Sequence, residues 1–179
     1  MLKERGVAAA IYTKSSSHSL GDPNSLIDKL ELALFAGKIA AYAQGFAVLE
    51  AASKEFSWNL PMATIARIWR AGCIIRSQFL DTIATAFEQN KGLANLLLAP
   101  DFVTMMQTST PALRHIVARS AQEGLPVPAL SSALAYFDSY RQQRGTANLI
   151  QAQRDFFGAH GFKRFDAEGD FHGPWGSGK

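Results

Sequence analysis

The chain has little cysteine, little charge and no uninterrupted apolar run long enough to cross a lipid bilayer. Its one cysteine, Cys73, excludes an intramolecular disulfide, and its apolar neighbours favour packing as a small hydrophobic side chain. Charged residues make up 18% of the 179 residues and hydrophobic residues 47%. A membrane-spanning helix needs about 20 consecutive apolar residues, and residues 1–5 are too charged to begin a secretory signal. These absences predict a cytoplasmic globular protein with no membrane partner.

Basic residues are too few and too scattered to predict a nucleic-acid partner. The formal net charge is only +3, and the lysines and arginines are spread along the chain. No basic run alternates with aromatic residues, as a nucleic-acid-binding stripe would. The spacing of His, Cys, Asp and Glu also matches no metal site. We therefore expect neither nucleic acid nor a metal ion as a ligand.

Apolar residues recur at three- and four-residue spacing over most of the chain, which is typical of helices. No segment shows the sustained alternation of a strand. The longest expected helix begins at Ser25 as the N-cap, and its stretch of small residues at 36–45 predicts close packing against other helices. The fold class is therefore an all-α multi-helix domain over residues 25–162, with helices expected at 25–56, 62–69, 77–89, 93–98, 102–107, 110–123, 128–144 and 146–158.

Both ends of the chain lack this helical pattern. Residues 1–24 include a polar stretch at 13–19 followed by turn-forming residues, which predicts a diverged, loosely ordered leader. Residues 163–179 are rich in glycine and predict an extended, irregular tail. Because Phe171 and Trp175 are costly to leave in water, we expect the tail to dock on a partner surface. The alternative is a disordered terminus.

Five segments carry patterns that occur together, in the same order, in one enzyme family. They are residues 33–46, 68–77, 133–141, 148–160 and 171–175. Together they resemble the all-helical C-terminal domain of decarboxylating 6-phosphogluconate dehydrogenase, with Ala71 in place of a family glycine. The arginine–histidine segment at 148–160 and the tail disfavour a helical domain of another β-hydroxyacid dehydrogenase.

The resemblance implies a role in oxidative decarboxylation. Enzymes of this family convert 6-phosphogluconate to ribulose 5-phosphate and CO2 in the pentose phosphate pathway, which serves gluconate utilization, and they reduce NADP. They are homodimers in which the helical domain supplies most of the interface. The matching residues here, Arg154 and His160, are expected to bind substrate in the active site of a partner subunit. The role of His172 in the tail stays open.

The spacing of Arg154 and His160 by itself leaves two interpretations. On an unbroken helix, side chains six residues apart point about 120° away from each other. Gly158 is expected to end the helix by adopting left-handed dihedral angles, which would leave His160 free to turn toward the anion that Arg154 binds. The alternative is that Arg154 pairs with Asp155 or another acid at the surface, while His160 caps carbonyl groups.

The family's catalytic machinery has no counterpart in this chain. No Gly-x-Gly-x-x-Gly pattern follows a strand, so no residue is assigned to bind NADP, and no catalytic residue of the family is matched. We therefore expect the isolated chain to be inactive. It is expected to be a C-terminal domain or fragment that needs a second copy or a full-length relative. The alternative is a catalytically silent helical dimerisation module or a gene remnant.

Overall fold

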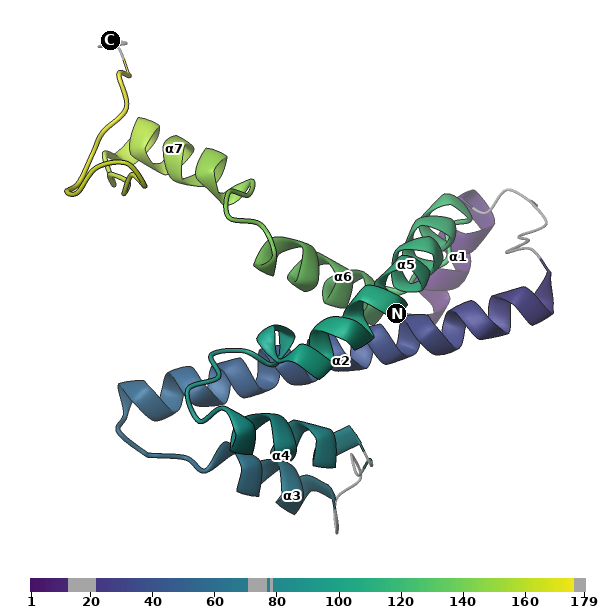
Figure 1. Cartoon of the computed structure of the whole chain (residues 1–179). Coiled ribbons are helices and arrows are strands. Elements are labelled where there is room, and N and C mark those ends of the chain that lie inside the picture. The colour runs from purple at the N-terminus through teal and green to yellow at the C-terminus, as the bar shows by residue number, and fades with distance from the viewer. Residues whose placement is uncertain (13–21, 71–76, 78, 176–179) are drawn as a thin grey trace. The chain divides into compact units, whose positions relative to one another are not determined.

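The computed structural model describes residues 1–12, 22–70, 77 and 79–175, and it shows a succession of helices (Figure 1). Over these residues the only β pairing is an isolated antiparallel bridge between Phe162 and Phe171, so the all-α prediction is confirmed. The elements are α1 (Leu2–Tyr12), α2 (Pro23–Glu55), α3 (Met62–Arg70), α4 (Phe79–Gln89), the 3-10 helix η1 (Leu96–Leu98), α5 (Pro100–Gln122), α6 (Pro128–Tyr140) and α7 (Ala147–Gly158).

The chain divides into two compact units. The N-terminal unit comprises Met1–Leu134 and the C-terminal unit comprises Ala135–Lys179. In the N-terminal unit, α2 packs against α5 and η1, and α3 packs against α4. In the C-terminal unit, α7 is followed by an irregular segment that returns to it through the Phe162–Phe171 bridge.

Small residues allow α2 to pack closely against its neighbours, as the sequence predicts. Ala33, Ala36 and Ala43 are fully buried on this helix. At Gly37 an added Cβ would lie 3.0 Å from the Leu130 side chain, so a larger residue would force the two apart. The limited space between helices therefore requires small residues at the centre of α2, although glycine has a lower helix propensity.

Aromatic side chains connect α2 to α3 and α4. The ring of Phe46 on α2 lies 5.3 Å from Trp69 on α3 and 5.3 Å from Phe87 on α4, measured between ring centroids. Phe79 of α4 forms T-shaped ring pairs with both Phe35 and Phe102. Such tilted and edge-to-face pairs stabilise a core beyond the area that they bury.

By length and composition alone, α2 could cross a membrane, because an 18-residue window in it reaches a mean hydropathy of 1.5. The expectation that no stretch qualifies was too strong: isolated charges interrupt the apolar run without lowering its mean hydropathy much. In the structure 39% of this window is buried, and the helix packs against α5 and η1.

Several helix boundaries differ from the sequence predictions: α6 ends at Tyr140 instead of residue 144, and the helix expected at 93–98 is reduced to η1. The N-cap of α2 is Asp22, whose Oδ2 accepts a hydrogen bond from the Ser25 backbone N–H at 2.9 Å. In addition, α5 is one continuous helix with Pro111 inside it, where the sequence predicted two helices at 102–107 and 110–123. Proline removes one backbone hydrogen bond, but buried side chains on both sides of it, such as Met106 and Leu113, keep the helix packed.

The expected leader contains a helix. Residues 2–12 form α1, in contrast to the prediction of loose order over 1–24. Its leucine, lysine, glutamate, arginine and three alanines are good helix formers, and none of its residues is buried. The polar stretch at 13–19, the thiol of Cys73 and most of the matched segment 68–77 lie outside the described residues.

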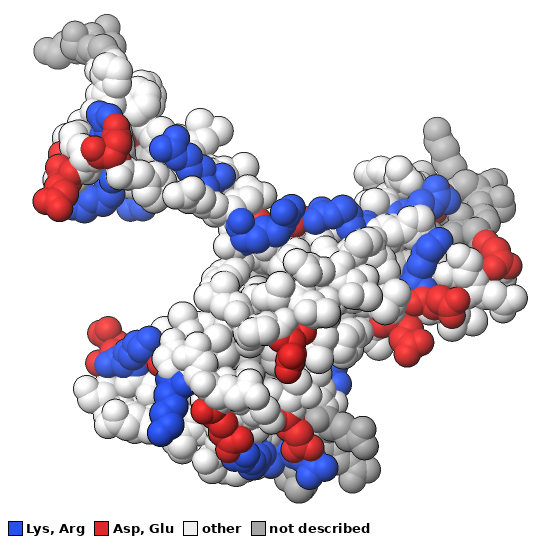
Figure 2. Space-filling view, in the orientation of Figure 1, with Lys and Arg blue, Asp and Glu red and all other residues white. Residues whose placement is uncertain are grey.

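Large apolar side chains remain exposed on both units. On α7 these are Leu149, Ile150, Phe156 and Phe157, each more than half exposed. Figure 2 shows charged side chains scattered among wide uncharged areas on the face in view. Several large apolar side chains left exposed on one helix are typical of a partner interface.

Replacing Phe46 by Ala should destabilise the N-terminal unit. The ring is 1% exposed, and truncating a buried phenylalanine costs about 3–5 kcal/mol. The matched control is Val48→Ala on the same helix, where the side chain is 63% exposed. Urea unfolding followed by circular dichroism would measure both. Equal effects from the two substitutions would contradict this core assignment.

Candidate functional site

Asp155 on α7 is the buried polar centre of the C-terminal unit, with its side chain fully inaccessible to solvent. Its Oδ1 accepts a hydrogen bond from the Gly161 N–H at 2.8 Å and lies 2.6 Å from His172 Nδ1. Its Oδ2 accepts from the Gly173 N–H at 2.8 Å and from Trp175 Nε1 at 2.6 Å. An ionised carboxylate only accepts hydrogen bonds, so His172 must carry its proton on Nδ1. These four donors replace the water that burial removes.

The donors hold Asp155 in its ionised form. The Gly173 N–H lowers the pKa of this carboxyl most, and Trp175, His172 and the Gly161 N–H lower it further. Burial acts in the opposite direction but is outweighed, so the pKa lies far below its usual value. At neutral pH the unit therefore contains a permanent buried negative charge that gathers the end of the chain around α7.

Gly161 is held from two directions. While its N–H donates to Asp155, its carbonyl accepts from Gln151 Nε2 at 2.5 Å. Gln151 and Asp155 are four residues apart, so they lie on the same face of α7. Gly161 has a positive φ of 70°, and a Cβ there would lie 3.4 Å from the Phe171 carbonyl. The corner after α7 is thus fixed by two side chains and by a conformation that favours glycine.

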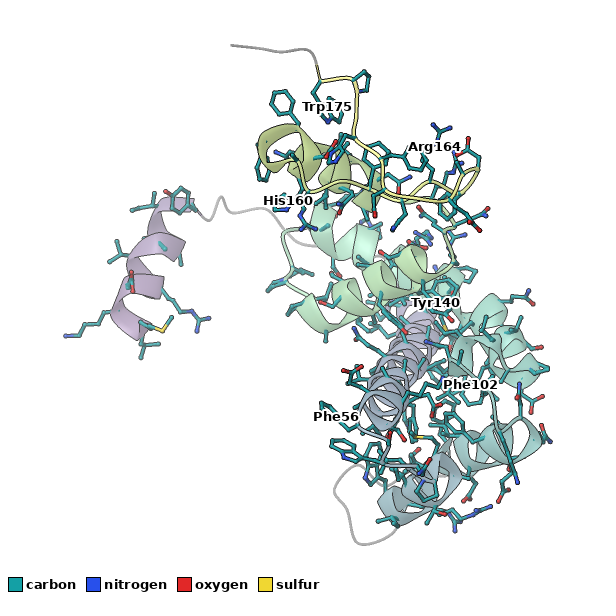
Figure 3. All side chains as sticks on the ribbon, turned by 90° about the vertical axis from the view of Figure 1, so that its left-hand side faces the viewer. Phe56, Phe102, Tyr140, His160, Arg164 and Trp175 are labelled. Carbon is teal, nitrogen blue, oxygen red and sulfur yellow. The ribbon has the colours of Figure 1, made fainter. Side chains whose placement is uncertain are left out.

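His160 lies in this corner, but the helix does not end as predicted. Gly158 is the last helical residue, and the left-handed residue is Ala159, with φ 48° and ψ 39°. Residue 158 is a glycine because space is limited there and not because of its dihedral angles. An added Cβ would lie 2.7 Å from His160 Nε2. The His160 side chain is exposed, and its ring meets Phe157 edge-on at 6.2 Å. Figure 3 shows His160 at the end of α7 and Trp175 on the segment beside the same helix.

Arg154 is exposed. Its Nη1 donates to Gln151 Oε1 at 3.2 Å. Over the residues that the structure describes, Arg154 forms no ion pair with Asp155, whose side chain is turned inward. No direct contact joins Arg154 to His160 in that part of the chain either. The two predicted site residues are connected through Gln151, which binds Arg154 on one side and Gly161, the neighbour of His160, on the other.

Sequence reasoning missed Asp155 and Gln151 as parts of this site. The apolar residues of α7 suggest a buried face that contains Phe156 and Phe157, but these side chains are exposed and the acid is buried. The one sequence feature that could have indicated a buried polar partner was the tail. Its histidine and the indole N–H of its tryptophan both need hydrogen-bond partners. For His172, whose role the sequence left open, the structure gives a contact with Asp155.

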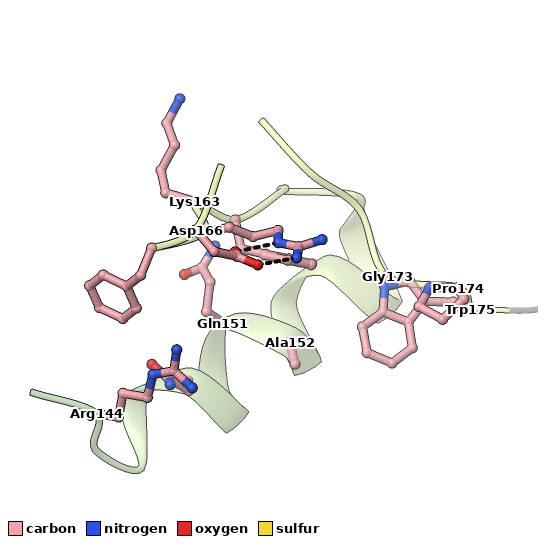
Figure 4. A pocket seen from close by; sticks show the side chains of 12 residues that line it. Arg144, Gln151, Ala152, Lys163, Asp166, Gly173, Pro174 and Trp175 are labelled. Carbon is pink, nitrogen blue, oxygen red and sulfur yellow. Dashed lines mark hydrogen bonds and ion pairs between the residues drawn. The ribbon is translucent and has the colours of Figure 1, made fainter. Parts of the chain in front are cut away.

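A cavity of about 580 Å³ lies between α7 and the tail (Figure 4). Its cationic lining residues are Arg144, Lys163 and Arg164. Two of these charges are already compensated, because Arg164 forms a two-fold contact with Asp166 and Lys163 pairs with Asp170 at 2.6 Å.

Arg164 lowers the pKa of Asp166 to about 2, so this exposed pair stays charged. Arg144 stacks over the ring of Phe165 at 5.4 Å. Neither Arg154 nor His160 lines the cavity. Among the described residues no cluster of His, Cys, Asp and Glu could hold a metal ion.

Comparison with known proteins gives one consistent result. The protein-family model for the 6-phosphogluconate dehydrogenase C-terminal domain matches residues 1–175. The decarboxylating 6-phosphogluconate dehydrogenase of Klebsiella pneumoniae is 52% identical over 175 residues, which cover 97% of this chain and 37% of that protein. The enzyme of Lactococcus lactis is 48% identical over 172 residues, which cover 96% of this chain and 36% of that protein. The chain therefore spans little more than a third of the length of these curated relatives.

A solved structure agrees in both fold and sequence. The 6-phosphogluconate dehydrogenase of Plasmodium falciparum superposes with a TM-score of 0.89 at 40% identity, covering 97% of this chain and 38% of that one. That protein was solved in its apo form, with its cofactor NADP+ and with its substrate 6-phosphogluconate.

Replacing Asp155 by Asn should destabilise the C-terminal unit in a pH-dependent way, because the amide would turn a donor toward existing donors. The folded-state pKa is lowered, so the carboxylate stabilises fully above the unfolded value of about 4 and loses this effect as the pH falls below it. The gap in urea midpoint between wild type and variant should be large at pH 7 and shrink below about pH 4. Glu168→Gln, at an exposed carboxylate of the same unit, is the control and should show a small gap. A gap independent of pH would contradict the assignment.

Proposed function

The chain belongs to the 6-phosphogluconate dehydrogenase family as its C-terminal domain, and on this premise we propose that it contributes Arg154 and His160 to the substrate site of a partner subunit. The substrate would be 6-phosphogluconate, and the complete assembly would carry out its NADP-dependent oxidative decarboxylation in the cytoplasm. The partner would be a second copy of the complete protein or a full-length relative. The observation that carries the proposal is the exposed Arg154, with donors left over, on the helix that also positions His160.

The chemistry of the two side chains suits a phosphorylated sugar acid. Arginine offers a planar set of donors that matches the oxygens of a phosphate or carboxylate. Histidine adds a donor whose charge follows pH near neutrality. Gln151 uses only one of the donors of Arg154. Exposure of both residues, next to the apolar side chains of α7, supports contact with a ligand held by another subunit.

NADP would be bound outside this chain in the proposed assembly. Dinucleotides bind at the edge of a parallel sheet where a strand leads into a helix, and the described ranges contain helices and one isolated bridge. In the proposed assembly, cofactor binding and the chemical step therefore belong to a polypeptide segment outside this chain. The chain by itself would bind no cofactor and show no activity.

Mixed subunits provide the test. A full-length relative whose own equivalents of Arg154 and His160 are replaced would be refolded with this chain, and NADPH formation from 6-phosphogluconate would be followed. Activity is expected only in the mixture. Arg154→Ala or His160→Ala in this chain should lower kcat/KM by about 10- to 100-fold, because a charged hydrogen bond to the substrate is lost.

The control is Arg141→Ala in the same unit, which removes an equal charge from an exposed pair with Asp138 and should leave the rate unchanged. Mixtures that form but have no activity would instead support a catalytically silent dimerisation module. Activity of the chain alone would contradict the proposal directly.

A further inference from the structure

We infer that Asp155 is a positioning residue that couples docking of the tail to the placement of His160. The inference rests on the proposed function of His160 and adds a residue that touches no substrate. It assigns the tail residues His172, Gly173 and Trp175 a defined task, which is to keep the Asp155 carboxylate where it can hold Gly161.

The coupling begins with the sharing of one carboxylate. Oδ1 is common to Gly161, at the corner, and His172, in the tail. Oδ2 is occupied by two tail donors, the Gly173 N–H and Trp175 Nε1. Three of the four donors thus come from the tail, and the fourth comes from the residue that follows His160.

Loss of the tail donors would therefore change the corner. An ionised carboxylate with a single donor cannot stay buried, because the remaining lone pairs would lack partners. Asp155 would then turn toward water and release the Gly161 N–H. Gln151 would still hold the Gly161 carbonyl, but that carbonyl belongs to the next peptide group, so the peptide between His160 and Gly161 would become free to rotate.

The position of His160 depends on that peptide. Its ring lies over Gly158 and beside Phe157, contacts that fix no hydrogen bond. With the peptide between His160 and Gly161 free to rotate, the ring would sample several orientations. A ligand would then have to order it, which weakens binding more than it changes the rate of the bound complex.

Packing supports docking of the tail onto α7. Trp175 meets Phe156 edge-on with ring centroids 5.9 Å apart. Its indole also lies across Gly173, where an added Cβ would be 2.2 Å from the ring. Gly173 is thus a position at which a methyl group would displace Trp175 without altering Asp155 itself.

Two substitutions test the coupling from opposite ends. Asp155→Asn changes the acceptor, whereas Gly173→Ala retains the carboxylate and displaces the indole. Asp166→Asn removes an exposed carboxylate from the same unit and serves as the control. Should Asp155→Asn fail to fold, Gly173→Ala still tests the inference.

Amide hydrogen exchange of this chain gives the structural readout. Asp155→Asn should accelerate exchange of the Gly161 amide by about tenfold or more, and Gly173→Ala, which removes one of the three tail donors, should accelerate it by a smaller factor. Both should broaden or shift the His160 ring signals in NMR spectra. The control should change neither. If Gly173→Ala frees the indole of Trp175 while Gly161 and His160 keep their wild-type exchange and signals, the coupling is absent.

The mixed-subunit assay gives the functional readout. Asp155→Asn should raise KM for 6-phosphogluconate by about tenfold, and Gly173→Ala should raise it by a smaller factor, while kcat changes less than twofold in both. Wild-type KM combined with faster Gly161 exchange would also overturn the inference. Failure of the proposed function is separate: in that case His160→Ala itself would leave the assay unchanged, whereas the exchange experiment would still report whether tail and corner are coupled.

Discussion

The C-terminal unit depends on one buried carboxylate. A charge removed from water must find donors, and Asp155 finds them in the corner after α7 and in the tail seventeen to twenty residues away in the sequence. The irregular segment after α7 contributes little regular structure, with one isolated bridge among its described residues. The hydrogen bonds to Asp155 therefore take the role that a core of apolar side chains takes in the N-terminal unit, where small residues bring α2 against α5.

This arrangement separates structural and functional residues along the same helix. Residues 151 and 155 share one face of α7 and hold the corner, while Arg154, one position before the acid, remains exposed. Because neighbouring residues on a helix point about 100° apart, a single turn can support a buried network and also present a side chain to a ligand. The large apolar residues of α7 are exposed as well, and in the proposed assembly a partner subunit would cover them.

Sequence alone predicted most of the helices, because periodic apolar residues and residues such as Pro61 and Pro128 mark their extent. It failed at Pro111, where tertiary packing outweighs a missing hydrogen bond, and at residues 2–12, whose helix propensity is masked by the polar stretch that follows. Arg154 and His160 came from family resemblance. Asp155 could not be predicted, because its burial depends on donors far away in the sequence and contradicts the apolar pattern of its helix. Likewise, the need for glycine at 158 became clear only with the His160 ring in place.

The most direct test is the titration of the Asp155 carboxyl carbon, followed by NMR on the folded chain between pH 7 and pH 2.5. A network of four donors predicts that this signal stays at its ionised position well below pH 4, where an exposed aspartate titrates. Signals of the Gly161 and Gly173 amides should remain unchanged over the same range. Protonation of Asp155 near pH 4, with the tail still docked, would contradict the view that this charge organises the unit.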